Sequence, residues 1–411
     1  MSSDTSLARH RSFLHFWFAR VFGTMANQMQ AVAIGWQIYG MTHSAFDLGL
    51  IGLVQFLPSL LLVFIAGHVI DRHDRRKIVV ICFALEALAS FVLVAGSQEG
   101  WLGRNAILFI MLMSGAIRAF KMPAMQTLLP GIMPSHLLPR ALAASASAMQ
   151  VAIIAGPAIG GLIYVASPVA VYATACASSA ISGWLVVLIR AEQIPARREP
   201  FSIESLFAGV AYIRTRPAIF GAISLDLFAV LLGGATALLP IYARDILLVG
   251  PWGLGLLSSA PAVGALTTSL FLARRPLERK AGQAMFTAVL VFGFSTLVFA
   301  ISTSYLLSLG ALVLLGASDM ISVVVRSSLV QLQTPDAMRG RVSAVNSVFI
   351  GTSNQLGEFE SGLTAFWFGT VPAVVLGGAG TILVALIWMR LFPQLAKMDN
   401  LHDALPENGA G

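Results

Sequence analysis

Apolar runs that are long enough to cross a lipid bilayer recur throughout this 411-residue sequence, and short polar breaks separate them. A transmembrane helix needs about 20 predominantly apolar residues. Twelve such runs cover residues 13–40, 47–69, 78–97, 104–129, 140–165, 168–190, 217–243, 252–273, 282–302, 305–330, 340–366 and 371–392. Only 11% of the residues are charged, against about 25% in soluble domains. The sequence therefore predicts an all-α integral membrane protein with twelve transmembrane helices.

The basic residues indicate how the chain is oriented in the membrane. If the N-terminus is cytoplasmic, twenty of the 26 Lys and Arg residues fall in cytoplasmic segments, and only Arg104 and Arg244 fall in outer loops. Positive residues collect on the cytoplasmic side of membrane proteins. We therefore expect cytoplasmic termini and an inner (cytoplasmic) membrane location. The net charge of +7 then reflects topology, and we expect no nucleic-acid partner.

The Cys, His and Gly patterns argue against metal, redox or nucleotide chemistry. Cys82 and Cys176 lie in apolar runs, where cysteine usually acts as a small packing residue. The seven His have no metal-ligand spacing, and no glycine cluster follows a strand as in a nucleotide-binding loop. We expect no metal, no cofactor and no enzymatic activity. A membrane-embedded enzyme would need a clustered nucleophile or metal set.

The only long polar interruption divides six apolar runs from six. Transporters often consist of repeated halves, and a shift of 201 residues places nine residues of the first half on identical residues of the second, including Gly115 on Gly316. We therefore predict two pseudo-symmetric six-helix bundles. The predicted parts are a cytoplasmic N-terminal segment 1–12, a bundle 13–190, a central cytoplasmic loop 191–216, a bundle 217–393 and a cytoplasmic polar tail 394–411.

The stretch "GHVIDRHDRRKIV", residues 67–79, concentrates charge between the second and third runs. It resembles the signature G-x-L-a-D-r-x-G-r-[KR] of the major facilitator superfamily, with Asp74 in place of the second glycine. "GPAIGG" and "TPDAMRGRVSAVNSVFIGTSNQLGEFESG" resemble the enterobactin-exporter-like group of drug and siderophore antiporters in that superfamily. The resemblance implies two bundles that open a central site alternately to each side of the membrane.

The resemblance also implies an inner gate, in which Asp71 reaches the start of the eleventh run. "TPDAMRGR" predicts an N-cap at Thr334 and a first helical residue at Pro335, where a helix end is positive. The expected gating residues are Gly67, Asp71, Arg72, Arg75, Arg76, Arg339 and Arg341. The alternative is that this loop is only a topological anchor with solvated charges.

"GPAIGG" lies in the fifth run and is similar to the antiporter signature of the superfamily. Its glycines and proline permit close helix approach and a bend. The expected motif residues are Gly156, Pro157, Gly160 and Gly161. The resemblance favours export by exchange, and an ordinary close-packed helix crossing is the alternative.

Five acids fall within the apolar runs, where charge is costly and indicates function. They are Glu86, Asp226, Asp319, Glu358 and Glu360. Proton coupling needs a carboxylate that changes its protonation with its surroundings. We rank Glu358 first, followed by Asp226 and Asp319. Intramembrane cations could instead pair with these acids and fix helix contacts.

Arg118 and Lys121 stand three residues apart on one helix face. Such a like-charge pair is unfavourable unless acids or an anionic ligand compensate it, so both are candidates for substrate binding. Pairing with Glu86 or Asp319 is the alternative. The other substrate-binding candidates are Arg326, Trp36, Tyr39, Phe56 and Phe349, and packing or interfacial roles are the alternative for the aromatic residues.

These features favour a proton-coupled exporter of a siderophore or a similar amphiphilic small molecule. We expect it to act as a monomer among membrane lipids. Multidrug efflux is the alternative within transport, and acids that dominate the site would favour cationic drugs. A non-translocating membrane sensor and a membrane-embedded enzyme are the alternatives from other classes.

Overall fold

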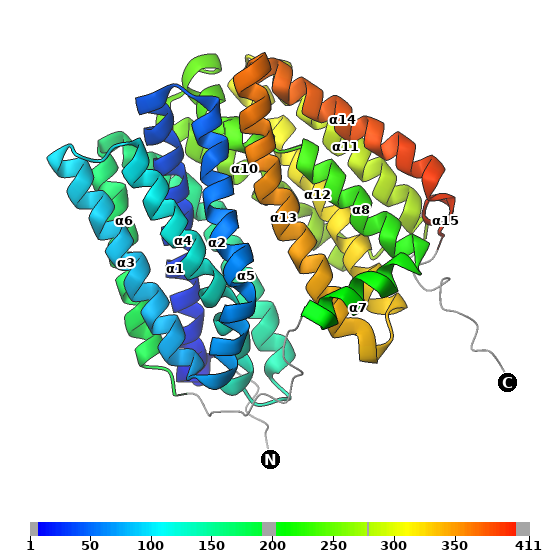
Figure 1. The fold of residues 1–411 in the computed structure, drawn as a ribbon, viewed down its shortest axis with the longest axis horizontal. Helices are drawn as coiled ribbons and strands as arrows, with labels where there is room; N and C mark the ends of the chain where they lie inside the picture. Colours follow the sequence, from blue (N-terminus) through cyan, green and yellow to red (C-terminus); the bar gives the residue numbers. More distant parts are fainter. Residues whose placement is uncertain (1–6, 191–202, 278, 400–411) are drawn as a thin grey trace. The chain divides into compact units, whose positions relative to one another are not determined.

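The computed structural model describes residues 7–190, 203–277 and 279–399, and every regular element in these ranges is a helix (Figure 1). Contacts between residues divide the chain into two compact units. Unit 1 comprises the described residues of Met1–Phe201 together with Tyr242–Ser259. Unit 2 comprises those of Ser202–Ile241 and Ala260–Gly411.

Unit 1 is built from six long helices and the first part of a seventh. They are α1 (Arg11–Thr42), α2 (Ala45–Arg72), α3 (Arg75–Glu99), α4 (Arg104–Leu128), α5 (Leu138–Ala166), α6 (Pro168–Val187) and the start of α10 (Gly250–Arg274). A π-helical turn, Tyr242–Ile246, precedes α10. α1 packs against α5 and α6, α3 against α4 and α6, and α2 against α4. Ser44 and Ser167 accept backbone hydrogen bonds that start α2 and α6.

Unit 2 has a related set of helices. They are α7 (Ile203–Arg214), α8 (Pro217–Leu232), the short α9 (Leu239–Ile241), the rest of α10, α11 (Ala281–Ile301), α12 (Tyr305–Gln333), α13 (Asp336–Phe368), α14 (Thr370–Leu391) and α15 (Pro393–Ala396). α8 packs against α13 and α14, and α11 packs against α12 and α14. Buried Met285, Phe286 and Leu329 contribute to its apolar core.

Eleven of the twelve predicted apolar runs each match one helix of the described ranges, with ends that agree within four residues. The run 217–243 is instead divided among α8, a short 3-10 helix, α9 and the start of the π-helical turn, because the helix breaks after Leu232. Ten helices in the described ranges are long and apolar enough to cross a membrane. The two other helices of comparable length are α1, with 32 residues, and α13, with 33. α1 carries two charged residues, both in its first ten, and α13 carries charged residues near its start and within its second half. The chain is an all-α, multi-pass membrane protein, and the crossing of the bilayer by α1 and α13 stays a prediction.

The two units repeat one helix arrangement. α12 starts 201 residues after α4, which is the shift predicted from the sequence. Gly115 on α4 lies against the backbone of Gln55, and Gly316 on α12 lies against the backbone of Pro261. A Cβ at either glycine would overlap the neighbouring helix. Equivalent glycines therefore permit equivalent close crossings, α4 with α2 and α12 with α10.

The segment expected to be a central loop contains helix α7. Gly209 of α7 lies against the backbone of Arg341, and the Tyr212 hydroxyl donates a hydrogen bond to the Gln333 carbonyl at 3.1 Å. Buried Ile213 packs with Val342 and Val345. The prediction of a loop is wrong from residue 203 onward, because apolar residues at helical spacing give this segment a face that α13 covers. Residues 1–6, 191–202 and 400–411 lie outside the described residues.

Candidate functional site

The charged loop between α2 and α3 is organised by helix ends. The Asp74 carboxylate accepts a hydrogen bond from the Arg76 backbone at 2.9 Å, which caps the start of α3. Arg75 donates to the Thr127 carbonyl in the last turn of α4 at 3.2 Å, and Arg76 donates to the Ile189 carbonyl just after α6 at 2.7 Å. Helix C-termini are negative, so the two guanidinium groups tie α3 to α4 and α6.

His73 ends α2, and both its backbone and its ring contact the Val69 carbonyl at 3.0 Å. Asp71 and Arg72 are exposed. No atom lies within 4 Å of the place where a Cβ on Gly67 would stand. Asp74 has an extended backbone (φ −61°, ψ 112°), so the turn does not need the glycine of the signature. The loop therefore has a structural function, and the exposed Asp71 is left available for another partner.

The start of α13 differs from its prediction. Thr334 ends α12, and its buried hydroxyl has no hydrogen bond within the described ranges. α13 begins at Asp336, and Pro335 is the N-cap residue. The predicted N-cap at Thr334 is wrong by one residue, since the fixed φ of proline suits either position. Arg339 is exposed and Arg341 is half-buried.

The "GPAIGG" motif brings α5 close to two other helices of unit 1. A Cβ on Gly160 would lie 2.7 Å from the Met29 Cα on α1. Gly161 faces the backbone of Pro251 and Gly255 on α10, and Pro157 lies inside α5. Its small residues therefore provide a close three-helix crossing. A close-packed helix crossing is the alternative that the sequence offers to an antiporter function of this motif.

Unit 2 contains a buried ion pair between α8 and α12. Arg326 pairs with Asp226, and their side chains are 3% and 6% exposed. The Arg326 Nε has no hydrogen-bond partner within the described ranges. The sequence predicted Arg326 as a candidate for substrate binding and Asp226 as a candidate for proton coupling. The structure pairs the two.

A small cavity lies beside this pair, between α8, α11 and α12. Its walls include Asp226, Asp319, Ser318 and Ser322. Ser318 donates to the carbonyls of Leu314 and Leu315, whereas the buried Ser322 hydroxyl has no partner within the described ranges. The other walls of the cavity are apolar, so two carboxylates share one small cavity inside an apolar bundle.

Unit 1 contains a second buried ion pair, between α3 and α4. Lys121 pairs with Glu86, and each side chain is 10% exposed. The Lys121 ammonium also lies 5.1 Å from the centroid of the Phe83 ring. Arg118, one turn earlier on α4, is exposed. The sequence left Lys121 either as a substrate-binding residue or as a partner of Glu86 or Asp319. In the structure Lys121 pairs with Glu86.

The two acids of α13 lie elsewhere in unit 2. Glu358 and Glu360 are half-buried, and neither lines the cavity. Glu360 accepts hydrogen bonds from Thr364 at 2.8 Å and from Ser361 at 3.4 Å, on its own helix.

The candidate aromatic residues make contacts of their own within each unit. Tyr39 on α1 donates a hydrogen bond to Asp245, and the Arg244 guanidinium lies 5.6 Å from the centroid of the Trp36 ring. Phe349 packs against the small core that joins α7 to α13. Phe56 is half-buried. Except for Phe56, these residues are engaged in packing or polar contacts.

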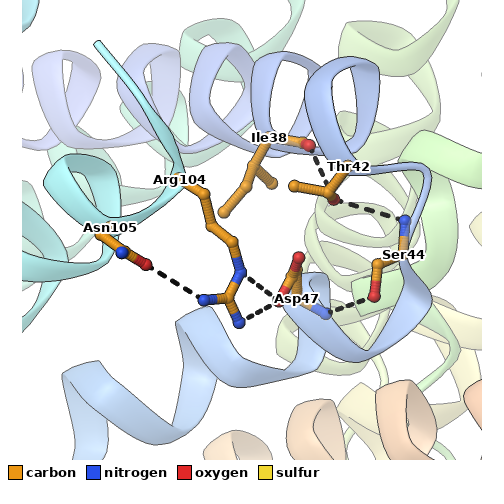
Figure 2. A network of polar contacts seen from close by, with 6 residues as sticks. All are labelled: Ile38, Thr42, Ser44, Asp47, Arg104 and Asn105. Atoms are coloured by element: carbon orange, nitrogen blue, oxygen red, sulfur yellow. Dashed lines mark hydrogen bonds and ion pairs between the residues drawn. The ribbon is translucent and has the colours of Figure 1, made fainter.

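A further polar network joins the α1–α2 turn to α4 (Figure 2). Asp47 accepts two hydrogen bonds from Arg104, from Nε at 2.8 Å and from Nη2 at 2.6 Å. The Asp47 backbone donates to Ser44, and Thr42 donates to the Ile38 carbonyl. Arg104, one of the two basic residues predicted in outer loops, thus fixes the start of α4 to α2.

Comparison with known proteins identifies the family. A family described as transmembrane secretion effector matches residues 2–408. The chain belongs to this major facilitator family. Its relatives include the enterobactin exporter EntS of Citrobacter koseri, which is 23% identical over 394 residues, and EntS of Escherichia coli O1:K1 / APEC, which is 22% identical. Each alignment covers 95% of this chain and 94% of the relative.

Solved structures of major facilitator transporters share the fold. The nucleoside transporter NupG is 14% identical, with a TM-score of 0.71 and coverage of 93% of this chain and 99% of NupG. A bacterial homolog of the human lysosomal transporter Spinster has a TM-score of 0.73 at 11% identity, covering 93% and 97%. These structures confirm the predicted fold class, and the family match over residues 2–408 confirms the predicted superfamily. The chain is a transporter and not an enzyme.

Several residues of these sites were missed in the sequence. The sequence pattern did not indicate Ser318, Ser322 or Asp47, because serine and terminal aspartates are common in membrane helices. Asp74 before an apolar run is an N-cap signal that could have been used. Within the described ranges, no group of three or more His, Cys, Asp or Glu side chains could hold a metal ion.

Proposed function

We propose that the protein is a proton-coupled exporter of a siderophore or a similar amphiphilic small molecule. The observation that carries this proposal is the similarity to enterobactin exporters over 95% of the chain. The segregation of basic residues supports an inner-membrane location with cytoplasmic termini. Export proceeds by alternating access of a central site, for which Gly156, Pro157, Gly160 and Gly161 provide a close helix crossing in unit 1.

The charges of α4 support an anionic substrate over a cationic drug. Arg118 is exposed, and it stands one turn from Lys121, whose own charge is compensated by Glu86. One positive charge therefore remains on this face. A guanidinium binds carboxylate or catecholate oxygens well because it offers several donors in a planar fork. This favours an acidic, siderophore-like ligand and places multidrug efflux second.

The inner gate is part of the same proposal. Asp71 is exposed at the end of α2, while its neighbours Arg75 and Arg76 hold α3 to other helices of unit 1. We assign Asp71 to the closing of the gate, with Arg339 and Arg341 at the start of α13 as its partners.

The test uses a bacterial strain that makes enterobactin but lacks its own exporter. We expect expression of this protein to move enterobactin from the cells to the medium during iron starvation. A variant with Asp71→Asn should be made in equal amount and should release much less, by about tenfold if the gate fails to close. Arg140→Gln, which alters an exposed basic residue of α5, is the matched control.

Unchanged partitioning of enterobactin between cells and medium would contradict the export of this siderophore. Release of enterobactin by the Asp71→Asn variant at the wild-type level would contradict the role of Asp71 in the gate, but not the export of this siderophore. Resistance to cationic dyes, without siderophore release, would favour multidrug efflux.

A further inference from the structure

The buried charges of unit 2 do not balance. Asp226 and Arg326 form an ion pair, and Asp319 lines the same cavity. Within the described ranges, no hydrogen bond or ion pair to Asp319 is found. If all three groups are ionised, one negative charge is left uncompensated inside an apolar helix bundle, which is energetically costly.

The helices around the cavity provide no further positive charge. α11 has no charged residue along its length. α14, which packs on α8 and α11, carries only Arg390, in its last turn, and α10, which crosses α12, carries only Arg274, also in its last turn. α13 packs on α8, but its acids Glu358 and Glu360 do not line the cavity. Neither do its two cations, Arg339 and Arg341, which lie in its first two turns. Charge balance at Asp319 therefore requires a bound cation.

The cavity suits a proton better than a metal cation. Hard metal ions bind through several oxygen ligands. Here the Ser318 hydroxyl is directed to carbonyls of its own helix, and Asp226 is paired with Arg326. This leaves Asp319 and the unpartnered Ser322 hydroxyl. Ser322 is 3% exposed and follows Asp319 by three residues, so the two side chains share one face of α12. A protonated Asp319 thus has a hydrogen-bond acceptor available on the same face.

We infer that Asp319 binds the proton that drives transport, and that Arg326 is a positioning residue, because it compensates Asp226 and leaves Asp319 as the acid that titrates. The inference rests on the proposed proton-coupled export. A proton from water binds a carboxylate oxygen of Asp319, and it returns to water on the other side of the membrane. This assigns the coupling function to α12, in place of Glu358 on α13, which the sequence ranked first.

The test separates coupling from substrate movement. The full-length protein is reconstituted in proteoliposomes, and enterobactin is followed in two assays: accumulation driven by an imposed pH gradient, and exchange of labelled for unlabelled enterobactin at equal pH. We expect Asp319→Asn to lose accumulation by about tenfold or more and to keep exchange within about twofold. Asp319→Glu should restore part of the accumulation. Glu360→Gln, a half-buried acid on α13, is the matched control.

A second readout does not depend on the substrate. The infrared band of a protonated carboxylic acid should grow as the pH of the wild-type protein is lowered, and Asp319→Asn should remove a component that Glu360→Gln keeps. Persistence of that component in Asp319→Asn, or loss of accumulation only in Glu358→Gln, would overturn the inference. Accumulation driven by sodium instead of protons would also overturn it. If the wild-type protein moves no enterobactin, the proposed function fails, and the infrared result decides the proton site alone.

Discussion

The two units place opposite charges at equivalent positions of equivalent helices. Arg118 and Lys121 on α4 correspond, 201 residues later, to Asp319 and Ser322 on α12. Each helix also contributes to one buried ion pair, Lys121 with Glu86 in unit 1 and Arg326 with Asp226 in unit 2. The charged residue outside the ion pair is the cation Arg118 in unit 1 and the acid Asp319 in unit 2.

This difference shows how a repeated fold can acquire two functions. The helix crossings are the same, because Gly115 and Gly316 allow the same close approach. The buried pairs connect helices in both units. They join different helices, α3 with α4 in unit 1 and α8 with α12 in unit 2, and the additional charge differs in sign. We propose that one repeat serves an anionic ligand and the other a proton. Substitutions in the two units should therefore have different consequences.

The largest effect is expected from Asp226→Asn. It removes the carboxylate that pairs with Arg326. Asp319 lines the same cavity without forming an ion pair within the described ranges, and a guanidinium cannot lose its proton in the protein. We expect a loss of about 3–5 kcal/mol in the free energy of unfolding. Chemical denaturation in detergent would measure it. A double variant that also has Arg326→Met should recover most of the stability, and a single variant as stable as the wild type would contradict the burial of the pair.

Lys121→Met should have a smaller effect, on the buried pair of unit 1. Here the residue left behind is Glu86, which can become neutral by binding a proton. We expect a loss of about 1–3 kcal/mol. The same denaturation measurement applies. A loss as large as that of Asp226→Asn would mean that the loss in the free energy of unfolding does not depend on whether the unpaired residue is an acid or an arginine.

Arg118→Gln tests the additional cation of unit 1. Arg118 is exposed, so the fold should be unaffected. We expect the dissociation constant for enterobactin to rise about tenfold, since one charge-assisted contact is lost. Binding to the purified protein would be titrated, with Arg140→Gln as the control. Equal weakening in both variants would assign the effect to net charge and not to a site.

The smallest effect is expected at the pair of Asp47 and Arg104 (Figure 2). The Arg104 side chain is 40% exposed, unlike the cations of the two buried pairs. We expect Asp47→Asn to lower the free energy of unfolding by about 1 kcal/mol or less. Thermal unfolding would measure this change. A loss comparable with that of Lys121→Met would contradict the importance of burial in this comparison.

The sequence predicted the helices well because apolar runs of this length have one stable form in a bilayer. It named Asp226, Arg326 and Asp319 as charges within the membrane, but it did not give their partners. Asp226 and Arg326 are 100 residues apart, and only the packing of α8 on α12 brings them together. Helix α7 was missed because charged residues on both sides mask the short apolar spacing of Val210 and Ile213.

The most direct test of the division between the units is the release of protons on substrate binding. Enterobactin would be added to the purified protein in a weakly buffered solution, and the change in pH would be recorded for wild type, Asp319→Asn and Glu360→Gln. We predict that all three bind, and that only Asp319→Asn fails to release a proton. Release by Asp319→Asn at the wild-type level would contradict the assignment of proton binding to unit 2.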